Sequence, residues 1–153
     1  MPALDLYDHQ SALPLDMARL FKVADLALPL ALAHPGPHPA ELPDLEEIEI
    51  SFLDDAAIAG VHAQFMDDPA PTDVITFQHG EILISTETAI RQAGEGGHSP
   101  QRECALYMIH GLLHLNGHDD HSAAEFAEMK RIQEAILNQV WPLEASGGTA
   151  AVA

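Results

Sequence analysis

One short segment of the chain reads His110-Gly111-Leu112-Leu113-His114-Leu115-Asn116-Gly117-His118-Asp119-Asp120-His121, and it constrains the fold more than any other stretch. On a helix, two histidines four residues apart project from the same face. Gly117, three residues after His114, allows a sharp exit from that helix, so that the chain can fold back and present a third ligand. This is the geometry of a zinc hydrolase site that keeps one coordination position open.

The third ligand must come from the short connection that follows Gly117. Ser122-Ala123-Ala124-Glu125 is a capping box that opens the next helix, so the connection is limited to residues 118–121. Asp120 lies three residues after the glycine, which is the spacing expected in such sites. His121 is the alternative, and His118 ranks third. We therefore predict one zinc ion per chain, bound by His110, His114 and Asp120.

Gly111 distinguishes this segment from the zinc peptidases, in which glutamate follows the first histidine and acts as general base. Glycine cannot accept the proton, which argues against a peptidase or amidase. We expect it to leave room for a bulky phosphodiester beside the metal. Another residue would then act as the general base, and the candidates are Asp73, Glu81 and His118. Alternatively, the water activated by the metal reacts without a general base. The segment offers no cysteine, which argues against a closed structural zinc site.

Charge limits the partners that the chain can have. Six Lys+Arg stand against 24 Asp+Glu, for a formal net charge of −18, and residues 41–55 contain acids and no base. Such a molecule repels polyanions at long range, so nucleic acid can bind only at a local patch. In the sequence, Arg91 comes before the start of the metal helix and Arg102 comes just after it. Both are candidates for phosphate contacts, although a solvated surface position is the preferred interpretation.

Length and composition predict one domain over residues 1–144 and a disordered tail over residues 145–153. No apolar run reaches the roughly 20 residues that a membrane span needs, and the first residues lack the pattern of a signal peptide. The single cysteine, Cys104, has no internal disulfide partner and is expected in the core. These features favour a cytoplasmic protein.

Hydrophobic periodicity predicts four strands, over residues 4–7, 48–52, 74–77 and 81–85. It also predicts five helices: residues 13–32 with an end or kink at Pro29, a helix after Asp54, residues 86–93, residues 100–117 and residues 123–140. The helix after Asp54 should bury Ile58, Val61, His62 and Phe65, and the last helix Phe126, Met129, Ile136, Leu137 and Val140. Residues 34–39 contain three prolines and a glycine, which predicts a flexible exposed loop.

Three stretches of the chain occur together, and in the same order, in one known family. The first is similar to a signature of the form His-Gly-x-Leu-His-Leu-x-Gly-Tyr-Asp-His and matches it at His110, Gly111, Leu113, His114, Leu115, Gly117 and Asp119. Pro71-Thr72-Asp73-Val74-Ile75-Thr76-Phe77 is similar to a Pro-Thr-Asp-Val-Leu-Ser-Phe strand, and Gly80-Glu81-Ile82 to the Gly-Asp-Ile strand that follows it. On these motifs, residues 48–137 resemble the YbeY family of bacterial endoribonucleases, also described as ribosomal RNA maturation factors.

The resemblance implies an α/β (α+β) fold with a small mixed sheet and a zinc site on a helix and its following turn. It implies a zinc-dependent single-strand endoribonuclease that acts in 16S rRNA 3′-end maturation and ribosome quality control. Ribosomal RNA and the small ribosomal subunit are the implied partners; DNA and membranes are not expected. The alternative is a non-catalytic ribosome assembly factor with a stabilising zinc, whose acidic surface would suit a basic ribosomal protein.

The chain departs from the family pattern at three positions. Asp120 stands where the family usually has its third histidine ligand, and His118 replaces the tyrosine of the signature. A family arginine expected before the Thr-Asp strand falls at Met66, so the resemblance implies that a contact to the phosphate backbone is missing.

Overall fold

A computed structural model of the chain describes residues 1–66 and 72–142. Within them, all four predicted strands and five predicted helices are present. In chain order they are β1 (Ala3–Asp8), α1 (Met17–Leu32), a short 3-10 helix (Leu42–Asp44), β2 (Glu47–Leu53), α2 (Asp55–Met66), β3 (Val74–Phe77), β4 (Glu81–Ser85), α3 (Thr86–Gly96), α4 (Pro100–Leu115) and α5 (Ala123–Val140).

The strands form one mixed sheet in the order β1-β2-β4-β3. β1 and β4 run parallel to β2 on either side of it, and β3 pairs antiparallel with β4 as an edge strand. The hairpin between β3 and β4 turns at Gly80, whose φ of +110° favours glycine. This α/β fold agrees with the prediction.

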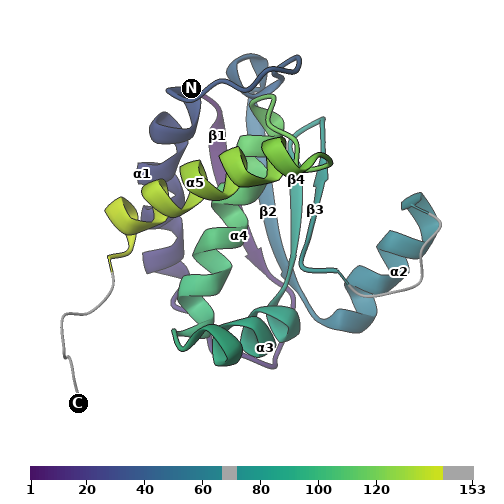
Figure 1. Cartoon of the computed structure of the whole chain (residues 1–153). Coiled ribbons are helices and arrows are strands. Elements are labelled where there is room, and N and C mark those ends of the chain that lie inside the picture. Colours follow the sequence, from purple (N-terminus) through teal and green to yellow (C-terminus); the bar gives the residue numbers. More distant parts are fainter. Residues whose placement is uncertain (67–71, 143–153) are drawn as a thin grey trace.

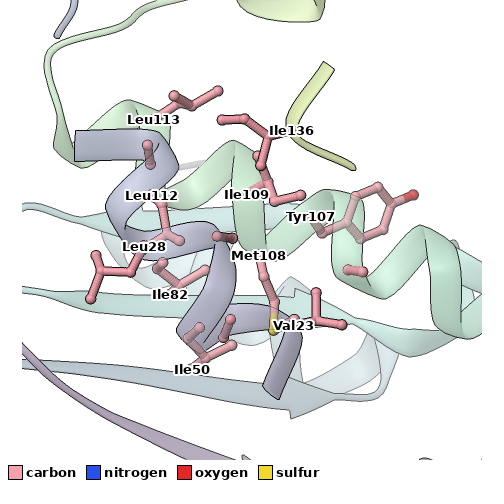
Figure 2. Packing of buried hydrophobic residues seen from close by; sticks show 14 of the residues in the cluster. Val23, Leu28, Ile50, Ile82, Tyr107, Met108, Ile109, Leu112, Leu113 and Ile136 are labelled. Atoms are coloured by element: carbon pink, nitrogen blue, oxygen red, sulfur yellow. The ribbon is translucent and has the colours of Figure 1, made fainter. Parts of the chain in front are cut away.

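The main core lies between one face of the sheet and helices α1, α4 and α5 (Figures 1 and 2). Alternation along β2 explains it, since Ile48, Ile50 and Phe52 are buried on this side while Glu47 and Glu49 face solvent. α4 crosses this face and is buried along most of its length, and Cys104 is part of this core as predicted. The metal-site helix is therefore anchored in the larger of the two hydrophobic clusters of the described residues.

α2 covers the opposite face of the sheet much less completely. Its contact is a small cluster formed by Ile58, Ile75 and Leu83, with Val61 and Phe77 packed beside it. The prediction that Phe65 belongs to the buried face of this helix is wrong, since that residue is 62% exposed.

Helix ends differ from the predictions in two places. α1 begins at Met17 and not at residue 13, because the Asp16 carboxylate accepts a hydrogen bond from the Arg19 amide and caps the helix. The helix also continues past Pro29 to Leu32, since Leu28 and Ala31 are held in the core on either side of the proline.

The last helix, α5, buries Met129, Ile132, Ile136 and Leu137 against α4 and α1. Phe126, predicted on the same face, is 55% exposed. The predicted domain boundary at residue 144 and the tail over residues 145–153 lie outside the described residues. None of the described helices combines the length and the apolar character needed to cross a membrane.

Candidate metal centre

Helix α4 fixes the first two candidate ligands. Ser99 caps it, because its hydroxyl accepts a hydrogen bond from the Arg102 amide at 3.1 Å, and Pro100 occupies the first turn, where its missing N–H costs nothing. The helix ends at Leu115, and the chain leaves through Gly117 with a φ of +90°. The predicted helix and its glycine exit are confirmed.

Three side chains converge here, two from α4 and one from the connection that follows Gly117. The Nε2 atoms of His110 and His114 lie 3.0 Å apart. Asp120 Oδ2 lies 3.6 Å from the first of them and 3.8 Å from the second. One possible ligand atom from each of these three residues lies within 4.8 Å of those of the other two. The structure therefore brings together the three residues that the sequence singled out.

The other ring nitrogens show which atoms are available to a metal. His114 Nδ1 lies 3.1 Å from the His118 carbonyl oxygen. A carbonyl oxygen only accepts, so Nδ1 carries the proton and Nε2 has a free lone pair in the neutral ring. His110 Nδ1 lies 2.8 Å from Gln133 Oε1 on α5. Burial lowers the pKa of His114, and His110 lowers it further, so this ring is neutral at pH 7.

This arrangement fits a zinc ion. Metal-bound histidines usually donate their second N–H to a protein acceptor, which fixes the tautomer and aims the ring. Two lone pairs facing each other at 3.0 Å repel unless a cation lies between them and the carboxylate. Two imidazoles and one carboxylate form a zinc donor set that leaves a position open. Gln133 is a supporting residue that sequence reasoning missed, because nothing in the pattern of α5 relates it to a histidine 23 positions earlier.

The two alternative third ligands occupy different places. His121 is turned to solvent, with its side chain 84% exposed, and its Nε2 lies 3.4 Å from Asp119 Oδ1. With Asp119 and Asp120 it forms a second, more exposed grouping of possible ligand atoms. The His118 ring is buried, and its Nε2–H donates to the His34 carbonyl at 2.6 Å. This bond uses His118 to hold the turn, so its predicted roles as ligand or general base do not agree with the geometry.

A cavity of about 670 Å³ opens over the three ligands and extends to β3. Asp73 and Thr76 are among its lining residues. The Asp73 carboxylate accepts a hydrogen bond from the Val74 amide at 2.8 Å and orders the start of the strand. Glu81, the other predicted base, lies at the start of β4 with its carboxylate 3.1 Å from His79 Nε2 and is not among the residues that line this cavity.

Residues 34–39, here called the strap, lie along the exit of α4. The Gly36 amide donates to the Asn116 carbonyl at 2.9 Å, and the His38 amide donates to the Gly117 carbonyl at 3.0 Å. A Cβ on Gly36 would lie 2.2 Å from the Gly117 oxygen, so only glycine permits this approach. This loop is mostly exposed, as predicted, but these backbone bonds hold it in place, which its proline-rich composition did not indicate.

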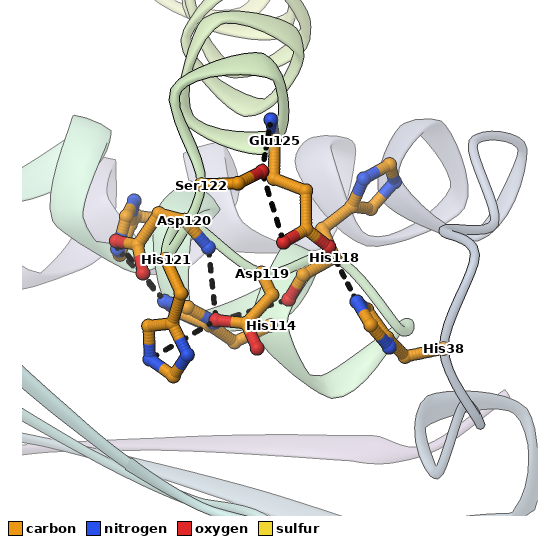
Figure 3. A network of polar contacts seen from close by, with 9 residues as sticks. His38, His114, His118, Asp119, Asp120, His121, Ser122 and Glu125 are labelled. Atoms are coloured by element: carbon orange, nitrogen blue, oxygen red, sulfur yellow. Dashed lines mark hydrogen bonds and ion pairs between the residues drawn. The ribbon is translucent and has the colours of Figure 1, made fainter.

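The strap is also tied to the start of α5. His38 Nε2 lies 2.5 Å from Glu125 Oε2, and the Ser122 hydroxyl accepts the Glu125 amide at 3.1 Å, as Figure 3 shows. The hydrogen bond that protonated His38 donates to the Glu125 carboxylate raises the pKa of His38. The turn that carries Asp120 is thus enclosed by α4, the strap and the capping box that the sequence predicted.

Comparison with known proteins identifies the family. A model described as Endoribonuclease YbeY matches residues 7–141. The chain belongs to the YbeY family. It is 41% identical over 110 residues to the Endoribonuclease YbeY of Moorella thermoacetica, which covers 60% of this chain and 70% of that protein. It is 31% identical over 146 residues to that of Thermobifida fusca, which covers 84% of this chain and 88% of the relative.

A solved structure agrees with the fold. The solution structure of a Thermotoga maritima protein matches with a TM-score of 0.62 and 21% identity, over 90% of this chain and 89% of the other. At this identity the match concerns the fold alone. Membership of the YbeY family supports an endoribonuclease role for the chain.

The basic residues of this YbeY-family chain lie away from the cavity. Arg91 pairs with Asp55 at 2.8 Å. Arg102 donates to the Trp141 carbonyl at 3.2 Å and to Asn138 at 2.9 Å. Both arginines therefore connect structural elements, and the possibility that they contact phosphate finds no geometric support. Met66, where the resemblance placed a missing arginine, lines the cavity.

Gly111 has a different role from the predicted one. A Cβ at this position would lie 2.8 Å from both Cγ2 and Cδ1 of Ile82, which is fully buried in β4. The interpretation that glycine leaves room beside the metal is therefore wrong, because the sheet fills that space. In this YbeY-family chain, Gly111 lets α4 pack closely on β4.

Gly111→Ala is expected to destabilise the fold by about 1–2 kcal/mol, since the crowding of a packed core costs more than the helix propensity that alanine gains. The matched control is Gly94→Ala in α3, where an added Cβ meets nothing within 4 Å. This control should gain about 0.5–1 kcal/mol. Urea unfolding of both variants measures the difference. Equal stabilisation of the two would contradict close packing at Gly111.

Proposed function

We propose that the chain is a zinc-dependent single-strand endoribonuclease that acts in the cytoplasm on the 3′ end of 16S rRNA and in ribosome quality control. The observation that carries this proposal is the convergence of His110 Nε2, His114 Nε2 and an Asp120 oxygen, with both Nδ1 atoms held by other acceptors. The family supplies the nuclease role, and the donor set supports the choice of metal.

Zinc held by these residues would supply Lewis acidity, polarising a phosphoryl oxygen and lowering the pKa of coordinated water toward about 7. The chain's own residues orient the metal ligands and bind the substrate. Gln133 and the His118 carbonyl fix the two imidazole rings. Asp73 is the carboxylate on the β3 side of the cavity, and we assign it the role of accepting the proton from the attacking nucleophile.

Thr76 is suited to bind the substrate. Its hydroxyl is buried and has no hydrogen-bond partner among the described residues, and the residue lines the cavity. An unsatisfied buried hydroxyl is costly, and a phosphate oxygen in the cavity would satisfy it. Thr76 on β3 and Asp73 directly before it thus place a hydrogen-bond donor and a proton acceptor on one side of the cavity.

The ribosome is the proposed partner. A net charge of −18 opposes contact with free RNA, and the cavity lining contains neither Lys nor Arg in the described part of the chain. We infer that the small subunit presents the RNA, and that a basic ribosomal protein contributes to the contact through the acidic surface.

Metal analysis combined with cleavage tests this function. The purified protein should hold about one zinc per chain. It should cut the 3′ end of precursor 16S rRNA presented on small subunits, lose this activity after chelation and regain it when zinc is restored. Cleavage that persists in the fully stripped protein would contradict metal dependence. A zinc-loaded protein that binds subunits but cuts nothing would favour the non-catalytic assembly factor.

A further inference from the structure

An aromatic group lies on α2 and β3 outside the metal centre. The rings of Phe65 and Phe77 meet edge-to-face with centroids 5.4 Å apart. Phe77 and His79 are stacked, with centroids 5.5 Å apart and an angle of 13° between their planes. Phe65 is 62% exposed, more than Phe21 or Phe126. We call these three residues the aromatic rim.

The aromatic rim lies next to the cavity lining in the chain but is not part of that lining, since Phe77 packs against the cluster under α2. Thr76 and Gln78, which alternate with Phe77 and His79 along the chain, line the cavity, as does Met66 next to Phe65. β3 is an edge strand, so no further strand separates the cavity from the rim. A polymer that leaves the metal ligands across this edge therefore meets the three rings.

Ionic anchoring of such a polymer is weak here. The lining of the cavity contains no Lys or Arg within residues 1–66 and 72–142, whereas it includes acidic side chains such as Asp73, Asp119 and Asp120. Several cations elsewhere already have partners: Arg91 binds Asp55, Lys130 binds Glu134, and Arg19 lies 3.5 Å from the centre of the Trp141 ring. Binding must therefore use contacts other than salt bridges to phosphate.

Stacking of bases on aromatic rings is such a contact. It tolerates any base, because every base has a π-face, and it needs an unpaired strand. We propose that the aromatic rim, through Phe65 above all, stacks an unpaired base of the RNA whose phosphodiester lies in the cavity. This inference rests on the proposed nuclease function and adds to it a reason for single-strand preference.

The test compares binding of a short single-stranded oligoribonucleotide to zinc-loaded wild type, Phe65→Ala and Phe65→Tyr. Phe65→Ala should weaken binding by about tenfold or more, and Phe65→Tyr, which keeps the ring, should stay near wild type. The matched control is Phe21→Ala, which should leave the affinity unchanged. Phe21 is also an exposed aromatic residue, but it lies on α1, away from α2 (Figure 1). Unfolding in urea checks that all variants are folded.

Two further measurements separate stacking from other contacts. A 2-aminopurine base in the oligonucleotide should lose fluorescence on binding to wild type and not to Phe65→Ala. An oligonucleotide with abasic positions should bind both proteins equally weakly. If Phe65→Ala binds as wild type does while wild type still cleaves RNA, the aromatic rim proposal fails and the nuclease proposal stands. A zinc-loaded wild type that neither binds the oligonucleotide nor cleaves precursor 16S rRNA presented on small subunits removes both.

Discussion

Asp120→Ala is expected to lower zinc affinity by more than the roughly 10–100-fold that loss of an outer hydrogen-bond partner costs. The carboxylate is one of three groups around a single point, 3.6 Å from His110 Nε2 and 3.8 Å from His114 Nε2. Its removal leaves only two histidines, too few for a stable zinc site. RNA cleavage should be lost together with the metal. Titration with zinc in a competing chelator measures the affinity.

Three variants serve as controls for this prediction. His121→Ala should keep the metal, because its side chain is 84% exposed and turned toward Asp119. The zinc affinity of Gln133→Ala should lie between those of His121→Ala and Asp120→Ala, about 10–100-fold below that of wild type. Asp120→His restores the ligand type that the family signature has and should keep zinc. If His121→Ala loses the metal and Asp120→Ala does not, the third ligand has been assigned wrongly.

Gly36→Ala is expected to destabilise the protein by about 3 kcal/mol. The new Cβ would lie 2.2 Å from the Gly117 oxygen and 2.5 Å from the His118 nitrogen. Both are backbone atoms that cannot turn aside, so the strap must move. Overpacking of this kind costs about 1–3 kcal/mol, and each strained backbone hydrogen bond adds about 1 kcal/mol. Urea unfolding gives the change in stability.

The same variant should weaken zinc binding, since the strap holds the turn between Gly117 and Asp120. Pro35→Ala is the matched control: this residue is exposed in the same loop, and its replacement should cost less than about 1 kcal/mol. Should Gly36→Ala prove as stable as Pro35→Ala, the close approach of strap and turn would be contradicted.

Local signals predicted most of the fold. Ser122 caps α5 as its capping box indicates, and the alternation of apolar and polar residues predicted the strands. Caps and alternation depend on neighbours within a few residues, so they can be read from one sequence. The two ligands one turn apart on α4 were found for the same reason.

Contacts between distant segments could not be predicted in this way. The strap, the Gln133 bond to His110 and the packing of Gly111 on Ile82 each join residues far apart in the chain. The role assigned to Gly111 was wrong because a sequence motif does not show which side of a helix faces the sheet. His118 was likewise expected near the metal, although its ring bonds to the His34 carbonyl.

The strap also affects the order in which the protein folds. Bonds from the strap and from residues on either side of it reach the end of α4, with partners separated by 84 positions for the His34–His118 bond and 85 for the Ala31–Asn116 bond. Closing so long a loop costs chain entropy before any contact repays it, so such pairings form late. During synthesis, the strap leaves the ribosome long before the helix that it must clasp. The turn that carries Asp120 therefore acquires its final geometry only when the strap has met the end of α4.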